Sequence, residues 1–294
     1  MKQDIYQTVT DKIVDAIESG SGEWQKPWTP GPGGLPVNAT TGRHYRGVNV
    51  LLLTISKPAS DLPPAWASYK QWAAAGCQVR GGEKGTAIVF AGAWTPKNDA
   101  VENDEQKTRK FLRYSHVFHC SQVDGYEAPE TVVRPLVERI ADADAFVAAT
   151  GAVIQYGGGR ACYSPDLDII QCPTFDSFDA TDTATASENG YSTILHEITH
   201  WSGHKSRCDR NLRNRFGDEA YAAEELVAEL GSAFLCASLG ITQEPRPDHA
   251  QYLSHWLRIL KNDKKAIFTA AARASDAAEY LHELTEPSQQ AKAA

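Results

Sequence analysis

The sequence lacks an apolar run long enough to cross a membrane, and its first residues contain no hydrophobic segment typical of a secretory signal. We therefore expect a cytoplasmic protein without a membrane partner. The six cysteines are scattered, and no two form a C-x-x-C pair. This spacing predicts reduced, mostly buried thiols rather than disulfides or a cysteine-held structural zinc. No internal repeat is present, and the glycine turn at residues 81–85 lacks the G-K-[S/T] ending of a phosphate-binding loop.

The 294 residues are enough for two domains or one large domain, and 42% hydrophobic with 22% charged residues is ordinary for a globular protein. The net charge of −8 is unevenly spread. Residues 1–98 hold ten lysines and arginines against seven acidic residues, whereas the rest holds 19 against 30. An acidic protein does not attract nucleic acid as a whole, but the basic first third can do so.

Hydrophobic spacing predicts an α+β fold. Helices are expected over residues 4–19, from about 47, over 67–75, 133–150, 187–201 and 219–239, and within 248–284. Strands are expected at 78–80, 86–90, 111–120, 153–155 and 167–171, and irregular structure at 24–37, 96–110 and 288–294. The pattern changes near residues 127–130. It predicts an N-terminal mixed α/β domain at 1–127 and a second domain, with a small sheet, at 128–294.

Residues 196–200 form an H-E-x-x-H motif within an expected helix. Because residues four apart share one helix face, His196 and His200 project side by side, as two ligands of one zinc ion must. Glu197 is placed to take a proton from a water that the metal activates, which makes it the candidate general base. The alternative is a helix that happens to carry two ordinary histidines. The pattern favours a metallohydrolase and, within that class, a peptidase.

A third metal ligand must come from another segment, because Ser206 stands where a longer form of the motif has its third histidine. Glu225 and Glu229 share one face of the next expected helix, although they could equally belong to a solvated acidic face. The arrangement resembles the glutamate-zincin metallopeptidases. That resemblance implies zinc, with Mn²⁺ as an alternative, Glu225 as ligand and Glu229 as hydrogen-bond partner of a ligand histidine. Since a glutamate replaces the family's shorter aspartate at 229, the two roles remain exchangeable.

Residues 157–170 suggest a glycine loop followed by an edge strand. Such a strand can bind an extended peptide by β-augmentation, although an ordinary hairpin fits the pattern as well. Tyr163, Arg160 and Tyr221 are candidates to polarise a substrate carbonyl, and nothing in the sequence selects among them.

The first 94 residues contain five of the seven tryptophans, and lysines and arginines are interleaved with them. Aromatic rings beside cations can stack bases and neutralise the backbone of single-stranded nucleic acid, although several of these rings can instead be core. The candidate contacts to single-stranded DNA are Trp24, Lys26, Trp28, Arg43, Tyr45, Arg46, Asn49, Tyr69, Lys70, Trp72, Arg80 and Lys84.

Five short motifs in this region carry a second resemblance: D-I-Y-Q at 4–7, W-Q-K-P-W at 24–28, P-V-N-A at 36–39, Y-R-G-V-N at 45–49 and G-E-K-G-T at 82–86. In this order they resemble the N-terminal domain of the ArdC-type antirestriction proteins, which also occurs in conjugative plasmid primases. That family carries an H-E-x-x-H domain in its C-terminal half. The resemblance implies a single-stranded-DNA-binding domain, a zincin-like metallopeptidase domain, and protection of plasmid DNA from host restriction during conjugation.

Three hypotheses follow for the function. The leading one is an antirestriction protein that binds single-stranded DNA and is a metalloendopeptidase with a protein substrate, its activity either DNA-dependent or vestigial. The second is a non-catalytic DNA-binding or DNA-mimicking protein with a structural or vestigial metal site, since the last two thirds of the chain are acidic. The third, metal-dependent chemistry on DNA, is disfavoured because nuclease sites use carboxylate-rich Mg²⁺ clusters.

Overall fold

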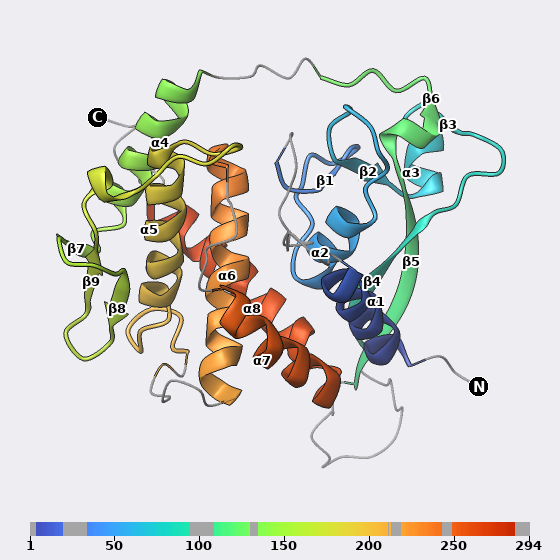
Figure 1. Ribbon diagram of the computed structural model, residues 1–294. Helices are drawn as coiled ribbons and strands as arrows, with labels where there is room; N and C mark the ends of the chain where they lie inside the picture. Colours follow the sequence, from blue (N-terminus) through green and yellow to red (C-terminus); the bar gives the residue numbers. More distant parts are fainter. Residues whose placement is uncertain are drawn as a thin grey trace, which may run out of the picture.

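The computed structural model describes residues 4–19, 34–94, 109–129, 135–210, 212, 219–242 and 249–285. Figure 1 shows two parts side by side, the first coloured from blue to green and the second from green to red. Two helices near the C-terminus reach from the second part towards the first. The α+β class expected from the sequence is confirmed.

In its described residues, the first part combines three α-helices with two small sheets. Its elements are α1 (Ile5–Ser19), β1 (Val37–Asn38), α2 (Val48–Ile55), β2 (Ala65–Ala67), α3 (Tyr69–Ala74), β3 (Gln78–Val79), β4 (Thr86–Trp94), β5 (Arg109–His119) and β6 (Val123–Asp124). The larger sheet has the order β1-β2-β5-β4, in which β1 and β2 are parallel and the other neighbours antiparallel. Strands β3 and β6 form a separate antiparallel pair.

Helix α1 forms as the sequence predicts because its apolar residues recur every four positions. Val9, Ile13 and Ile17 are each at most 2% exposed, so one face of the helix is buried and the opposite face is polar. Helix α3 begins at a capping box, in which the Ser68 hydroxyl accepts from the backbone N–H of Gln71 and the Gln71 side chain accepts from that of Ser68.

The second part is mainly helical. Its elements are α4 (Leu136–Ala149), β7 (Val153–Tyr156), β8 (Cys162–Ser164), β9 (Ile169–Cys172), α5 (Ala186–Ser202), α6 (Glu219–Leu239), α7 (His249–Asn262) and α8 (Ala266–Thr285). The sheet has the order β7-β9-β8, with β9 parallel to β7 and antiparallel to β8. It lies beside α5 (Figure 1). The edge strand expected within residues 157–170 is therefore present as β8.

The largest hydrophobic cluster joins the two parts. It contains Ile13 and Leu51 from the first part together with Leu230, Trp256 and Ala274 from the second, each at most 1% exposed. Helix α1 contacts α7, and α2 contacts α8. The boundary predicted at 127/128 therefore separates the secondary-structure elements of the two parts but does not divide the core.

Several other expectations concern single segments. The cysteines are free thiols, and Cys77, Cys120, Cys172 and Cys236 are buried, as predicted. The loop expected at 96–110 lies outside the described residues except for its last two, which begin β5. The segments 20–33 and 286–294 also lie outside them. Among the helices that the structure describes, none combines the length and hydrophobicity needed to cross a bilayer.

Candidate metal centre

Helix α5 carries the H-E-x-x-H motif through the interior of the second part. The helix begins at a capping box, in which Thr185 accepts from the backbone N–H of Glu188 and the Glu188 carboxylate accepts from that of Thr185. From Tyr191 to Thr199 every residue of α5 is buried. The rings of His196 and His200 lie on one face with their centroids 4.9 Å apart. Two imidazoles thus reach the same place from a firmly packed helix.

Helix α6 approaches α5 closely because of two small residues. A Cβ atom added at Gly231 would lie only 2.5 Å from Cγ2 of Thr199, so no larger residue fits there without displacement. The hydroxyl of Ser232 donates to the backbone oxygen of Ser192 at 3.0 Å. These contacts agree with the sequence, in which Gly231 and Ser232 favour a close approach of the two helices.

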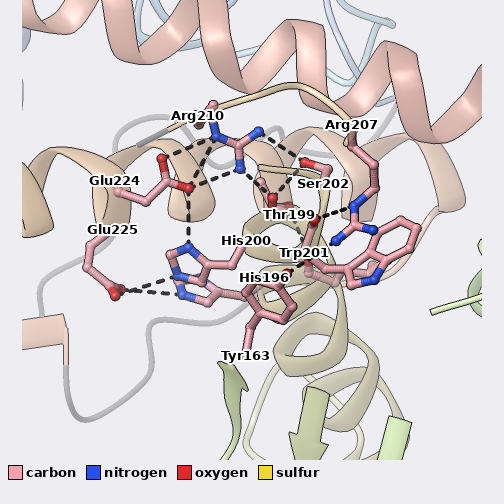
Figure 2. A network of polar contacts seen from close by, with 11 residues as sticks. Tyr163, His196, Thr199, His200, Trp201, Ser202, Arg207, Arg210, Glu224 and Glu225 are labelled. Atoms are coloured by element: carbon pink, nitrogen blue, oxygen red, sulfur yellow. Dashed lines mark hydrogen bonds and ion pairs between the residues drawn. The ribbon is translucent and has the colours of Figure 1, made fainter. Parts of the chain in front are cut away.

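Glu225 on α6 lies between the two histidines. Its Oε2 is 3.5 Å from Nε2 of His196, and its Oε1 is 3.5 Å from Nε2 of His200 (Figure 2). One donor atom from each of these three residues lies within 4.8 Å of the other two. Two imidazole nitrogens and one carboxylate are a common ligand set for Zn²⁺ and related divalent ions, so the residues present fit such an ion.

The outer nitrogens of both histidines face further carboxylates. Oε2 of Glu229 lies 3.7 Å from Nδ1 of His196, and Oε1 of Glu224 lies 3.3 Å from Nδ1 of His200. Such carboxylates fix the tautomer and ring orientation of metal-binding histidines. The geometry separates the two roles that the sequence left exchangeable: Glu225 is in the ligand position, and Glu229 is on the far side of His196.

Glu224 is itself held by a buried arginine. Nε of Arg210 lies 3.2 Å from both carboxylate oxygens of Glu224, and the guanidinium also donates to Ser202 Oγ and to the backbone oxygen of Thr199 (Figure 2). Arg210 is 8% exposed. Sequence reasoning missed both residues, because nothing in the spacing links Arg210 to a glutamate that is next to the predicted ligand.

The charges of the centre reinforce one another. Burial alone would raise the pKa of Glu225, but the charge of His200 and hydrogen bonds to both histidines hold that pKa far below its usual range. Burial alone would lower the pKa of His200, but Glu225 and Glu224 raise it well above its usual value. The acidic cluster therefore favours a cation at the histidines, and protons compete with a metal ion for the same nitrogens.

Glu197 directly follows His196 on α5, a helix that contacts both β8 and β9. It is 5% exposed, and its charge contributes, after burial, to raising the pKa of the Cys172 thiol to about 12. Cys172 is the last residue of β9. Glu197 therefore lies near the end of β9 and directly follows the histidine that Glu225 faces.

The edge strand β8 is attached to the end of α5 by Arg207. This guanidinium stacks 3.8 Å from the ring centroid of Trp201 and donates to Asp168 Oδ2 at 3.0 Å and to the hydroxyl of Tyr163 at 3.2 Å. Tyr163 in turn donates to Asp168 at 2.7 Å, and burial together with this bond raises its pKa. Its hydroxyl is thus engaged with partners other than a substrate. Of the other two candidates for polarising a carbonyl, Arg160 is exposed and Tyr221 is half-buried.

Among the predicted DNA contacts that the structure describes, six have exposed side chains: Arg43, Arg46, Tyr69, Lys70, Arg80 and Lys84. Tyr69 is 51% exposed at the start of α3. Trp24, Lys26 and Trp28 lie outside the described residues.

Three further candidates are buried or half-buried. Trp72 is 1% exposed and donates its Nε1–H to the backbone oxygen of Phe118 at 3.0 Å, so its ring is core and is not available for stacking bases. The side chain of Asn49 exchanges two 2.8 Å hydrogen bonds with the backbone of Val89. Tyr45 is half-buried, and burial raises its pKa.

The last two candidates are arginines in ion pairs at the surface. Arg80 pairs with Glu83 at 3.1 Å and with Asp124 at 3.3 Å, and Arg46 pairs with Glu279 at 2.6 Å. Arg46 and Glu279 are about half exposed. Exposed pairs of this kind contribute only about 0–1 kcal/mol, so a phosphate can displace the carboxylates at little cost.

The hairpin of β4 and β5 exposes an aromatic surface that sequence reasoning missed. Phe90 is 47% and Phe111 41% exposed, and the guanidinium of Arg113 lies 4.7 Å from the Phe90 ring centroid. The only signal in the sequence was the alternation of Phe111 and Arg113, which predicts a shared face of a strand but not which face is exposed.

The two halves of the chain match two family models. Residues 3–118 match the N-terminal domain of the anti-restriction factor ArdC, and residues 141–273 match the zincin-like metallopeptidases. The two matched segments lie on either side of the boundary predicted at 127/128. The second part is therefore a zincin-like metallopeptidase domain.

Three relatives are similar over almost the whole chain. The uncharacterized protein y4eC of Sinorhizobium fredii (strain NBRC 101917 / NGR234) is 42% identical over 290 residues, which are 95% of this chain and 92% of that protein. Two DNA primases named TraC from Escherichia coli are 37% and 35% identical over 96% and 95% of this chain. The matched region spans only 27% and 20% of those primases.

Two solved structures share the fold, and both are crystal structures of the antirestriction ArdC protein from the R388 plasmid. The metal-free structure has a TM-score of 0.77 and 38% identity, covering 96% of this chain and 98% of that one. The Mn(II)-bound structure has a TM-score of 0.76 and 37% identity, covering 98% and 100%. With this likeness over essentially the full length of both chains, and with both family models in the same order, the chain belongs to the ArdC family of antirestriction proteins.

Proposed function

We propose that this protein binds single-stranded DNA, cleaves a protein substrate with a divalent metal, and thereby protects DNA from host restriction during conjugation. The setting is the cytoplasm, where incoming DNA meets restriction enzymes. The catalytic part of this proposal rests on one observation, the position of Glu225. One of its carboxylate oxygens lies 3.5 Å from Nε2 of His196, and the other lies 3.5 Å from Nε2 of His200.

His196, His200 and Glu225 would hold the metal, and Glu229 and Glu224 would orient the histidines from their Nδ1 sides. The related R388 protein is described with Mn(II), and the ligand set suits zinc equally well. The metal, when bound, supplies a Lewis acid that lowers the pKa of a water molecule. We favour zinc, with Mn²⁺ as the alternative.

The remaining chemistry belongs to the residues of the chain. Glu197 would accept the proton of the attacking water and pass it to the leaving nitrogen. The edge strand β8 has no strand partner on its outer side among the described elements, so an extended peptide can pair with its backbone there. The hydrogen bonds among Arg207, Asp168 and Tyr163 would hold this strand in a fixed position against α5.

The DNA-binding part is supported by the exposed aromatic and cationic residues of the first part. Tyr69, Lys70 and Lys84 are exposed there, and Phe90 and Phe111 add a second aromatic surface. Stacking on exposed rings contributes about 1–3 kcal/mol per base, and lysines beside them neutralise phosphates. The affinity for an oligonucleotide should therefore decrease as the salt concentration rises.

The test compares the wild type with Glu197→Gln and His196→Ala. The wild type should contain about one divalent metal per chain, and it should cleave a casein substrate with or without the single-stranded oligonucleotide dT20. Glu197→Gln should keep the metal and lose cleavage, whereas His196→Ala should lose both. Glu138→Gln, a change at an exposed glutamate of α4, is the matched control and should leave both unchanged.

Two outcomes would contradict the proposal. A wild-type protein free of metal after purification and after addition of zinc or manganese would refute the metal centre. Full antirestriction in cells by Glu197→Ala would show that proteolysis is not the working mechanism. It would favour the second candidate, a non-catalytic DNA-binding or DNA-mimicking protein, for which the 30 acidic against 19 basic residues after position 98 are the supporting observation.

A further inference from the structure

A pocket of about 870 Å³ lies where the loop before α2 meets helices α6 and α8. One wall comes from the first part of the molecule and includes Arg43, His44, Tyr45 and Arg46. The opposite wall comes from the second part, and none of its residues belongs to the metal centre. The pocket therefore lies at the junction of the two parts, and three residues predicted as DNA contacts line it.

The floor of this pocket is apolar and belongs to the shared core. Val50 on α2 is 1% exposed, Phe234 on α6 is 2% exposed, and Ala278 on α8 is 9% exposed, and all three belong to the shared core. Ligand sites of this volume typically combine such a floor with a few polar groups. These three side chains are almost closed to solvent and bound the pocket, so the half-buried ring of Tyr45 in the first wall is the aromatic surface that a flat ring system can reach.

The polar groups of the pocket lie around this floor. The exposed Ser238 forms a 2.9 Å hydrogen bond with His282 on one side and donates its hydroxyl proton to the backbone oxygen of Leu235 at 2.8 Å, so its oxygen can accept from a ligand. Arg43, which is exposed, and Arg46 supply positive charge on the other side. Glu279 also lines the pocket, where it pairs with Arg46. The ligand should therefore carry an anionic group as well as a ring with hydrogen-bonding edges.

We propose that this pocket binds one nucleotide, with its base beside Tyr45 and its phosphate at Arg43 and Arg46. The inference rests on the proposed binding of single-stranded DNA and adds a defined site to it. A phosphate has to compete with both Asp276 and Glu279 for Arg46, which costs little because both ion pairs are exposed. Since α6 forms one wall, a bound nucleotide contacts the helix that also carries Glu225.

The test uses a substitution that fills the pocket with a bulky side chain. It measures binding of a fluorescent dT20 oligonucleotide to the full chain. Ala237→Phe places a bulky side chain at a half-buried lining position and should weaken binding at least about tenfold, the equivalent of one lost stacking contact. Ala145→Phe, the same change at an exposed position of α4, is the matched control and should bind as the wild type does. Thermal unfolding of each variant checks that it is folded.

Arg43→Gln is the second variant, and it should weaken dT20 binding and reduce its salt dependence. Its matched control is Arg258→Gln, at an exposed arginine of α7 that does not line the pocket. A dT20 carrying 5-iododeoxyuridine should cross-link to the peptide that contains Tyr45 or to the one that contains His282. A parallel titration with thymidine monophosphate shows whether the ligand of the pocket is a free nucleotide or a nucleotide within a DNA strand.

The outcomes of these experiments distinguish failure of the pocket inference from failure of the proposed DNA binding. If the wild type binds neither dT20 nor thymidine monophosphate, the proposed DNA binding and the pocket inference both fail. If it binds dT20 while Ala237→Phe and Arg43→Gln bind equally well, or if the cross-links map to the hairpin of β4 and β5, DNA binding stands and the pocket inference is overturned. Tight binding of thymidine monophosphate alone supports the pocket and refutes the DNA function.

Discussion

His200 is the most extensively supported residue of the candidate metal centre. Its Nε2 faces Glu225, its Nδ1 faces Glu224, and Glu224 is held in turn by Arg210. A carboxylate at Nδ1 favours the tautomer with the proton on that nitrogen, which leaves the lone pair of Nε2 for a metal. The guanidinium of Arg210 compensates part of the negative charge that three neighbouring glutamates bring to the site.

Glu224→Gln should weaken metal binding without removing a ligand. An amide is a poorer acceptor than a carboxylate, so His200 is oriented less strongly and its basicity decreases. Loss of such a partner typically costs about 10–100-fold in metal affinity. The affinity is measured by competition with a chromogenic chelator for Zn²⁺ and for Mn²⁺.

The matched control is Glu283→Gln, at an exposed glutamate of α8, which should bind metal as tightly as the wild type. Urea unfolding of the metal-free variant shows whether the protein remains stably folded when the buried Arg210 loses its carboxylate partner. Unchanged chelator competition in folded Glu224→Gln would exclude a positioning role for Glu224.

At the scale of elements, the start of α5 is the point where three segments are joined. Besides the capping box with Thr185, Glu188 accepts from Arg139 on α4 and from the backbone N–H of Thr242 after α6, both at 3.1 Å. Burial alone would raise the pKa of Glu188, but hydrogen bonds from Thr185 and Thr242 lower it to about 2. One carboxylate thus fixes the N-terminal end of the helix that carries the histidines.

This depressed pKa makes a prediction about stability and pH. Since the folded state binds the proton more weakly than the unfolded state, the stabilisation is complete above the ordinary pKa of 4.5 and is lost as the pH falls towards about 2. Glu188→Gln should therefore lower the free energy of unfolding by about 1–3 kcal/mol near neutral pH. The difference from the wild type should shrink steadily below about pH 4.

Urea unfolding at a series of pH values measures both quantities. Glu138→Gln, at an exposed position in the first turn of the neighbouring α4, should show neither effect. A difference between Glu188→Gln and the wild type that stays constant down to about pH 3 would contradict the role assigned to the charge.

At the scale of the whole molecule, the two parts share one hydrophobic core. Helices α1 and α2 pack against α7 and α8, and the buried faces of these helices belong to a single cluster. The exposed ion pair between Arg46 and Glu279 also links the parts but contributes little. Removal of either part would expose apolar surface of the other, so the two should unfold together.

Ile13→Ala tests this cooperativity from the N-terminal side. Ile13 is fully buried on α1, and its truncation should lower the free energy of unfolding by about 2–5 kcal/mol. This loss of stability should shift the whole urea transition to lower urea concentrations. The distant histidines should release their metal over the same range of concentrations. Asp15→Ala, an exposed change on the same helix, should have less than about 0.5 kcal/mol effect. Two separate transitions in Ile13→Ala would contradict a shared core.

The sequence by itself determined the elements with long periodic patterns and the chemistry of the motif. The spacing of Val9, Ile13 and Ile17 predicted α1, and the spacing of His196 and His200 predicted two donors on one face, because helical periodicity is a local property. Short strands such as β1 and β6 were not predicted, because two residues carry no period of their own.

Tertiary structure alone decided which side chains meet. It separated Glu225 from Glu229, and it brought Arg210 to Glu224, because contacts between helices depend on how closely Gly231 lets them approach. It also showed that Trp72 is core, since composition cannot tell a buried ring from an exposed one. The junction pocket likewise exists only because residues more than 180 positions apart pack together.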